Sequence, residues 1–138
     1  MTELLLDASV WVASADQDDP QHRAASILVE RGADADISVS ALDLTLYEVA
    51  NTAVVKLKSP RDALELVRLV EVACGDGLLR VDLELLREAS TLAVERALSI
   101  YDAAYVAVSQ RRGASLVSID SDLVGPGFAI TPAQAVGA

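Results

Sequence analysis

The segment Leu4-Leu5-Leu6-Asp7 is a short apolar run that ends in an acidic residue. A continuous apolar run of this length predicts a strand buried on both faces, and the aspartate marks the turn that follows it. Further strands are predicted at 37–39, 78–81 and 115–119, with a last short strand at 128–130. Helical patterns separate the strands, so the chain predicts an α/β fold with a mostly parallel central sheet covered by helices on both faces.

Helical spacing and capping signals place the helices between these strands. Three helix starts share one pattern, a serine three residues before an acid, at Ser40, Ser59 and Ser99. Each serine hydroxyl can accept a hydrogen bond from the amide three residues on, while the acid lies at the positive end of the helix dipole. The predicted ranges are 21–31, ended by Gly32, then 41–57, 60–73, 83–97 and 99–112.

Length and composition predict a single folded domain that spans residues 1–138. The chain is 52% apolar and 23% charged, and it contains no linker, repeat or low-complexity tract. Its formal net charge of −10 argues against a protein that holds nucleic acid mainly through a broad basic surface. This charge does not exclude an enzyme that binds phosphate through a metal ion.

Two residue types exclude several kinds of site. Cys74 is the one cysteine and His22 the one histidine, so an internal disulfide, a zinc–thiolate cluster and a site of several imidazoles are excluded. An unpaired cysteine suits a reducing compartment. The N-terminus lacks the positive stretch of a secretory signal, and no segment is predicted to span a membrane. We therefore expect a cytoplasmic protein.

Four acids lie where chemistry is expected in such a fold. Asp7 and Asp120 each directly follow a predicted strand, and ligands of open α/β sheets bind beyond the carboxyl ends of the strands. Glu48 and Asp102 interrupt apolar stretches of predicted helices, which is costly unless their charge is compensated. We expect these four side chains to converge.

A shared pocket for four carboxylates would need cations. Two carboxylates about 6 Å apart repel by roughly 3 kcal/mol at an effective dielectric constant near 20. Oxygen ligands without histidine or cysteine favour Mg²⁺ or Mn²⁺ over zinc. The natural substrate of such a site is a phosphate ester, because the metal polarises the phosphoryl oxygen and activates water.

Each acid also has a purely structural interpretation. Asp7 could cap the helix that follows it, and Asp102 could be an ordinary helix-start acid. Glu48 could extend from a helix edge into solvent. Asp120 and Asp122 could be turn residues whose side chains bond to nearby amides. Spacing alone leaves these roles and a shared site both open.

Four short motifs occur in the order found in PIN-domain ribonucleases, and the chain resembles this family, VapC toxins most of all. The resemblance extends from Asp7 to Asp122, and four motifs in order are a fairly specific combination. The motifs are Leu5-Leu6-Asp7-Ala8-Ser9-Val10, Glu48-Val49-Ala50-Asn51, Tyr101-Asp102-Ala103-Ala104-Tyr105-Val106-Ala107 and Leu116-Val117-Ser118-Ile119-Asp120.

The resemblance implies a compact α/β/α fold and a Mg²⁺- or Mn²⁺-dependent endoribonuclease, the toxin of a type II toxin–antitoxin module. Ser9 matches a hydroxyl that commonly follows the first acid, and Ser118 stands where a threonine is frequent. Asp122 offers a fifth acid, and either Asp120 or Asp122 could lead as ligand. The positions that match the family's metal-holding, catalytic acids are Asp7, Glu48, Asp102 and Asp120.

The partners implied by the resemblance are an RNA substrate, a small antitoxin with a basic C-terminal segment that blocks the site, and a second copy in a homodimer.

Two other functions are alternatives to the ribonuclease. A PIN-like scaffold without catalysis would bind partners but no metal. A signalling receiver also has an acidic Mg²⁺ pocket, but it needs a lysine after a late strand, and this chain has none beyond Lys58.

Overall fold

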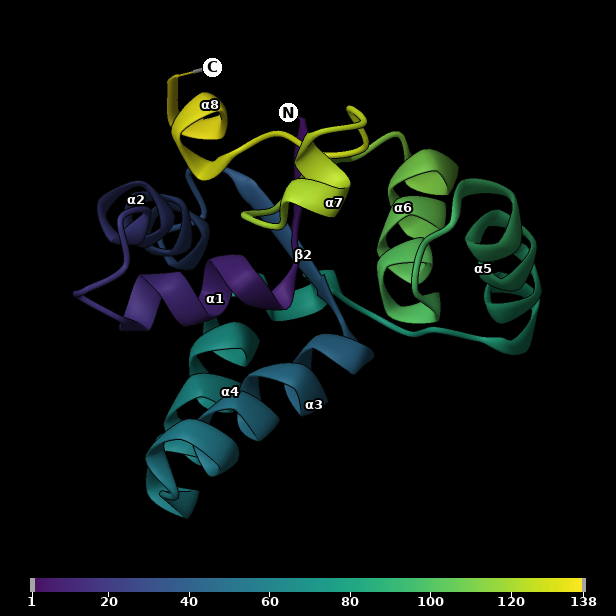
Figure 1. The fold of residues 1–138 in the computed structure, drawn as a ribbon. Coiled ribbons are helices and arrows are strands. Elements are labelled where there is room, and N and C mark those ends of the chain that lie inside the picture. The colour runs from purple at the N-terminus through teal and green to yellow at the C-terminus, as the bar shows by residue number, and fades with distance from the viewer. Residues whose placement is uncertain (1, 138) are drawn as a thin grey trace.

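A four-stranded parallel sheet forms the centre of the computed structural model, which describes residues 2–137 (Figure 1). Its strands are β1 (Glu3–Leu6), β2 (Ser38–Leu42), β3 (Leu78–Leu79) and β4 (Ser115–Val117). They lie in the order β3-β2-β1-β4, and each neighbouring pair is parallel. The first strand of the chain is therefore central, and residues that follow β1, β2 and β4 meet at the same edge of the sheet.

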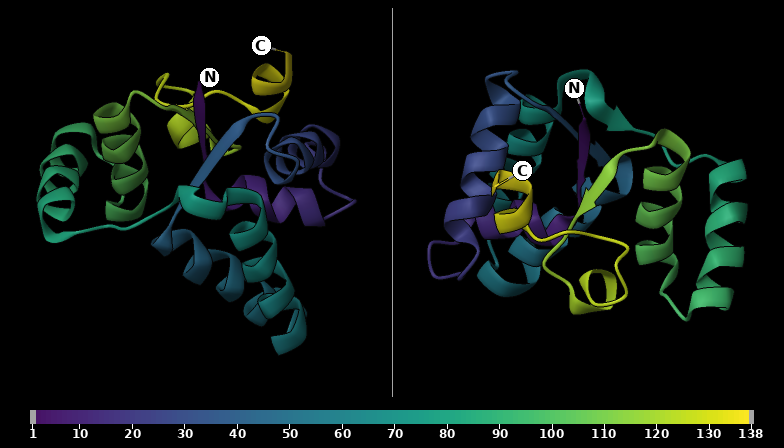
Figure 2. Two further views of the ribbon diagram at one scale, coloured as in Figure 1. Left: turned by 180° about the vertical axis from the view of Figure 1, so that it is seen from behind. Right: turned by 90° about the horizontal axis from the view of Figure 1, so that it is seen from above.

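Helices cover both faces of the sheet, as the sequence predicts. They are α1 (Ala8–Ala15), α2 (His22–Ala33), α3 (Asp43–Thr52), α4 (Pro60–Cys74), α5 (Leu83–Arg96), α6 (Ile100–Arg112), α7 (Ser121–Val124) and α8 (Pro132–Gly137). A π-helical turn, Ala53–Leu57, extends α3, and a 3₁₀ turn, Gly75–Gly77, follows α4. Figures 1 and 2 show α5 and α6 side by side on one side of the sheet, with α1, α2 and α4 on the other. No helix among residues 2–137 has both the length and the apolar character to cross a membrane.

The apolar run of β1 divides between two cores, one on each face. Leu6 packs with Trp11 and Leu28 in the core under α1, α2 and α4. Leu5 packs with Tyr105 and Leu116 in the core under α5 and α6. Successive side chains of a strand point to opposite faces. An unbroken apolar run is therefore what a strand buried on both sides requires, and the prediction from Leu4-Leu5-Leu6 is confirmed.

Two of the three predicted serine caps are confirmed and one is wrong. Ser59 and Ser99 accept hydrogen bonds from the amides of Asp62 and Asp102, at 3.2 and 3.1 Å. Ser40 instead lies inside β2 and is fully buried. The reason is tertiary, because β2 gains a parallel neighbour on each side and burial there outweighs a local cap.

Other predicted boundaries also shift where tertiary contacts compete with local signals. Gly32 does not end the second helix, which continues to Ala33; a Cβ at Gly32 would lie 2.9 Å from Val39 Cγ2, so the glycine allows close packing on β2. The strand predicted at 78–81 ends at Leu79, and the Val81 amide donates to Asp43 instead. The strands predicted at 115–119 and 128–130 reduce to β4 and a single bridge between Val117 and Ile130.

Candidate metal and catalytic site at the carboxyl edge of the sheet

The turn after β1 places Asp7 at the carboxyl edge of the sheet, directly against β4. Its amide donates to the Val117 carbonyl at 3.1 Å, so the aspartate is held where both strands end. The Asp7 side chain is only 5% exposed. Asp7 is also the N-cap residue of α1. Capping that helix does not by itself explain why the side chain is buried against β4.

Two serine hydroxyls hold the Asp7 carboxylate. Ser9 donates to Asp7 Oδ1 and Ser118 donates to Asp7 Oδ2, both at 2.5 Å. Each serine oxygen also accepts a backbone amide, from Ile119 for Ser9 and from Asp120 for Ser118, both at 3.0 Å. Because the amides occupy the acceptor side of each hydroxyl, the hydroxyl protons are directed at the carboxylate. The carboxylate is thus fixed in orientation by neutral donors.

The charge of Asp7 has no cationic partner within residues 2–137. Burial raises the pKa of Asp7 from 3.8 to about 6, although the hydrogen bonds from Ser118 and Ser9 act to lower it. The nearby charge of Glu48 raises this pKa further. Such a carboxylate favours either a proton or a bound cation.

Glu48 is held by a chain of hydroxyls that begins at the end of β2. The Leu42 amide donates to Thr45 Oγ1 at 3.0 Å, and Thr45 Oγ1 lies 2.7 Å from the Tyr105 hydroxyl. Tyr105 in turn donates to Glu48 Oε1 at 2.7 Å. Burial raises the pKa of Glu48, the Tyr105 hydrogen bond lowers it, and the charge of Asp102 raises it.

Asp102 lies in the first turn of α6 and is half-buried. Its pKa is raised by burial first, and then by the charges of Asp120 and Asp122. Asp120 accepts a hydrogen bond from the Asp122 amide at 2.9 Å and so caps α7, as the turn-residue interpretation predicts. Asp122 itself is exposed.

The four acids singled out by the sequence thus form a continuous series of like charges. Repulsion from Glu48 raises the pKa of Asp7, repulsion from Asp102 raises that of Glu48, and repulsion from Asp120 raises that of Asp102. Within residues 2–137, no group of three or more His, Cys, Asp or Glu side chains is already placed to hold a metal ion. The donors are oxygen atoms of the kind that suits a hard divalent cation.

Sequence reasoning missed Tyr105 as part of this site. The i, i+4 spacing of Tyr101 and Tyr105 suggests core packing for both, yet Tyr101 is 55% exposed whereas Tyr105 is 1% exposed. The signal was present in the spacing, because Tyr105 lies three residues after Asp102, on the same face of α6. Its hydroxyl is buried and so needs a partner, which Thr45 and Glu48 provide.

A pocket of about 410 Å³ is lined by Glu48 but by none of the other three acids of the series, and we call it the Glu48 pocket. It lies where α1, α3 and the loop after β4 meet. Its lining residues are Ala8, Ser9, Val12, Asp19, Glu48, Asn51, Thr52, Lys56 and Ile119.

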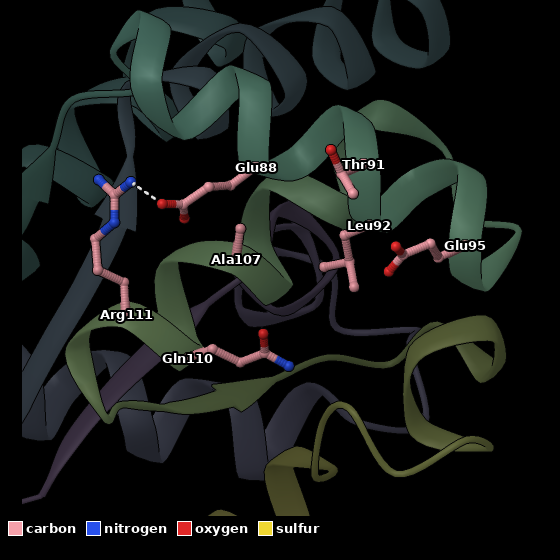
Figure 3. Close-up of a pocket in the computed structure, with 7 residues that line it drawn as sticks. All are labelled: Glu88, Thr91, Leu92, Glu95, Ala107, Gln110 and Arg111. Carbon is pink, nitrogen blue, oxygen red and sulfur yellow. Dashed lines mark hydrogen bonds and ion pairs between the residues drawn. The ribbon is translucent and has the colours of Figure 1, made fainter.

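A larger hollow, the α5–α6 pocket, contains none of the predicted site residues (Figure 3). Its volume is about 580 Å³, and it is lined by Glu88, Thr91, Leu92, Glu95, Ala107, Gln110 and Arg111. Glu88 from α5 and Arg111 from α6 form an ion pair at 2.8 Å across it. The charge of Glu88 is therefore already compensated.

The comparisons with known proteins identify the family of the chain and proteins of similar fold. Residues 4–128 match the PIN domain family. The solved structure of PAE2754 from Pyrobaculum aerophilum is 25% identical with a TM-score of 0.70, covering 99% of this chain and 95% of that chain. VapC20 from Mycobacterium tuberculosis, a sarcin-ricin loop cleaving toxin, is 22% identical with a TM-score of 0.71. The match covers 91% of this chain and 96% of that chain.

A toxin–antitoxin complex from Klebsiella pneumoniae is similar in fold at 18% identity, with a TM-score of 0.66 and coverage of 94% of this chain and 97% of that chain. Curated protein sequences provide no match. The family match covers most of the chain and includes every acid of the series described above. The protein therefore belongs to the PIN-domain family.

Proposed function

We propose that this protein is a Mg²⁺- or Mn²⁺-dependent endoribonuclease that acts as the toxin of a type II toxin–antitoxin module. Membership of the PIN family supports a nuclease. The observation that carries the proposal is the environment of Asp7, a buried carboxylate oriented by two hydroxyls, with like-charged neighbours and no cationic partner in residues 2–137. A divalent cation would satisfy this arrangement.

In this proposal the metal ligands and catalytic residues are Asp7, Glu48, Asp102 and Asp120. A bound cation would polarise the phosphoryl oxygen and generate the nucleophile from water. Ser9 and Ser118 keep the Asp7 carboxylate in one orientation, and Tyr105 does the same for Glu48. Binding of the cation would relieve the repulsion among the four acidic side chains, which would move closer together.

The proposed substrate is RNA, and the proposed partner is a small antitoxin whose basic C-terminal segment covers the acids. Solved relatives of similar fold include a toxin and a toxin–antitoxin complex, which supports the partner. The net charge of −10 also favours a basic partner over long-range attraction of RNA. We further propose a homodimer in the cytoplasm, with residues 1–138 acting as one domain.

Cleavage of RNA in the presence of Mg²⁺ or Mn²⁺ tests the proposal. Hydrolysis adds water to the phosphorus and breaks the P–O3′ bond, so the expected products carry a 5′-phosphate and a 3′-hydroxyl. Asp7→Asn and Asp102→Asn should abolish cleavage, whereas Glu88→Gln, in the α5–α6 pocket, should not change it. Equal activity of the wild type and both Asn variants would remove this mechanism.

A scaffold without catalysis is the second candidate, because no three acids are grouped around a ready-made metal position in residues 2–137. Titration with Mn²⁺ separates the two functions. The nuclease should bind Mn²⁺ in a manner that depends on Asp7, and the scaffold should show no such carboxylate-dependent affinity. The PIN family match argues against the receiver-like alternative.

A further inference from the structure

The Glu48 pocket contains one feature that the acids do not explain, the Lys56 ammonium among its lining groups. Glu48, Thr52 and Lys56 all line this pocket, and they come from one continuous stretch, α3 and the π-helical turn that follows it. Lys56 therefore borders the same cavity as Glu48.

The backbone around Lys56 is unusual. Residues Ala53–Leu57 form a π-helical turn, and Lys58 ends it in the left-handed region with φ of 50°. Turns of this kind inside helices are frequently found at functional sites. Here the turn lies directly after α3 and carries Lys56 at the rim of the pocket.

Lys56 is exposed and has no carboxylate within ion-pair distance in the part of the chain that the structure describes. Arg61, Arg111 and Arg112 differ from it, because each forms an ion pair with a glutamate. Asp19 also lines the pocket, and its carboxylate accepts the Gln21 amide at 2.8 Å in a local turn. Lys56 is thus available to an anion.

The pocket lining combines carboxylates, Glu48 and Asp19, with one ammonium, Lys56. A nucleic-acid backbone carries a phosphate at every nucleotide, so a metal ion held by the acids can take one phosphate while Lys56 takes a neighbouring one. A lysine ammonium is a compact point charge with three donors, which suits a phosphate oxygen. A basic peptide, by contrast, gains no such contact from Lys56.

We propose that Lys56 binds the RNA phosphate that neighbours the scissile one, so that the Glu48 pocket is the substrate groove. The Asn51 amide also lines the pocket and would supply hydrogen bonds to the nucleotide, whereas the Thr52 hydroxyl donates to the Glu48 carbonyl at 3.1 Å and would only accept one. This inference rests on the proposed ribonuclease function, and it assigns a substrate contact outside the acidic quartet.

The test compares Lys56→Gln with Lys58→Gln. Both variants remove one positive charge from the same segment, but Lys58 does not line the pocket. With a single-stranded oligoribonucleotide and Mn²⁺, Lys56→Gln should raise KM about tenfold with little change in kcat. The slope of log KM against log salt concentration should fall by about 0.7 for Lys56→Gln alone. Lys56→Arg should restore most of the affinity.

Two control measurements separate the loss of a phosphate contact from a loss of folding or of metal binding. Urea unfolding should give the same stability for both glutamine variants, and Lys56→Gln should not weaken Mn²⁺ binding. If the wild type cleaves RNA and the two variants have equal KM and equal salt dependence, this inference is wrong while the nuclease stands. If the wild type cleaves no RNA, the proposed function fails and the inference fails with it. Unchanged KM together with tighter binding of a basic peptide would assign the pocket to a protein partner instead.

Discussion

The carboxyl edge of the sheet and the α5–α6 pocket both contain carboxylates, but the two regions treat them differently. At the sheet edge, neutral hydroxyls orient Asp7 and Glu48 and leave their charge in place. In the α5–α6 pocket, Arg111 neutralises Glu88 at 2.8 Å (Figure 3). Glu88 in the larger hollow is thus paired with a cation, whereas Asp7 and Glu48 have no ion-pair partner within residues 2–137.

The partner of a carboxylate therefore indicates its chemical role better than the size of the hollow beside it does. Serine, threonine and tyrosine hydroxyls fix geometry without supplying charge. A site built this way keeps its affinity for an external cation, while an arginine in the same place would remove it. The two regions should therefore respond differently to the loss of a charge.

The largest expected effect is on metal affinity. Asp7→Asn should weaken Mn²⁺ binding, measured by isothermal titration calorimetry, about 100-fold or more, because the variant loses the negative charge and one of the two oxygens that accept the serine hydroxyls. Glu88→Gln should leave the affinity unchanged. Equal weakening in both variants would mean that general surface charge, and not the sheet edge, attracts the ion.

The pH dependence of stability should show the uncompensated charge directly. The pKa of Asp7 is raised from 3.8 to about 6, so the folded state holds a proton that the unfolded state has released between these values. Without metal, the stability contributed by Asp7 should be present below about pH 4 and lost as the pH rises through about 6, a loss of roughly 3 kcal/mol.

Urea unfolding from pH 4 to pH 7 checks this, with Asp7→Asn as reference because its amide does not titrate. The difference in unfolding free energy between Asp7→Asn and the wild type should shift in favour of the variant as the pH rises. A difference that stays constant with pH would contradict a raised pKa for Asp7.

A smaller effect is expected from Tyr105→Phe, which removes the hydroxyl between Thr45 and Glu48. The stability should fall by about 1–2 kcal/mol, since a buried hydrogen-bond chain is cut. Activity should fall about tenfold, as for loss of a group that positions a metal ligand. Because the Tyr105 hydrogen bond lowers the pKa of Glu48, the acidic limb of the pH–rate profile should also move to higher pH. If the acidic limb of the profile does not move, Tyr105 contributes only to packing.

The smallest effect is expected in the α5–α6 pocket. Arg111→Gln breaks the exposed ion pair with Glu88, and solvent screening makes such pairs weak. Thermal unfolding should show a minor decrease in Tm, and RNA cleavage should be unchanged. A large loss of activity would mean that the α5–α6 pocket takes part in the function after all.

Much of the fold could be predicted because its signals are local. The Leu4-Leu5-Leu6 run, the Ser59 and Ser99 caps and the alternation of strands with helices each depend on neighbours in the chain, and all are confirmed. The cap predicted at Ser40 is wrong because its pattern competes with strand pairing, a contact that sequence spacing does not contain. The identity of the acids followed from four short motifs, and their functional roles stay predictions.

Hydrophobic pattern and residue type are enough to predict the α/β class, the burial of the first strand on both faces and the acids that follow the strands. Which group holds which carboxylate depends instead on three-dimensional packing. Ser118 reaches Asp7 across 111 residues and Tyr105 reaches Glu48 across 57, and these partners meet because β1 lies between β2 and β4. Strand order and helix packing set such contacts, and neither leaves a local mark on the chain.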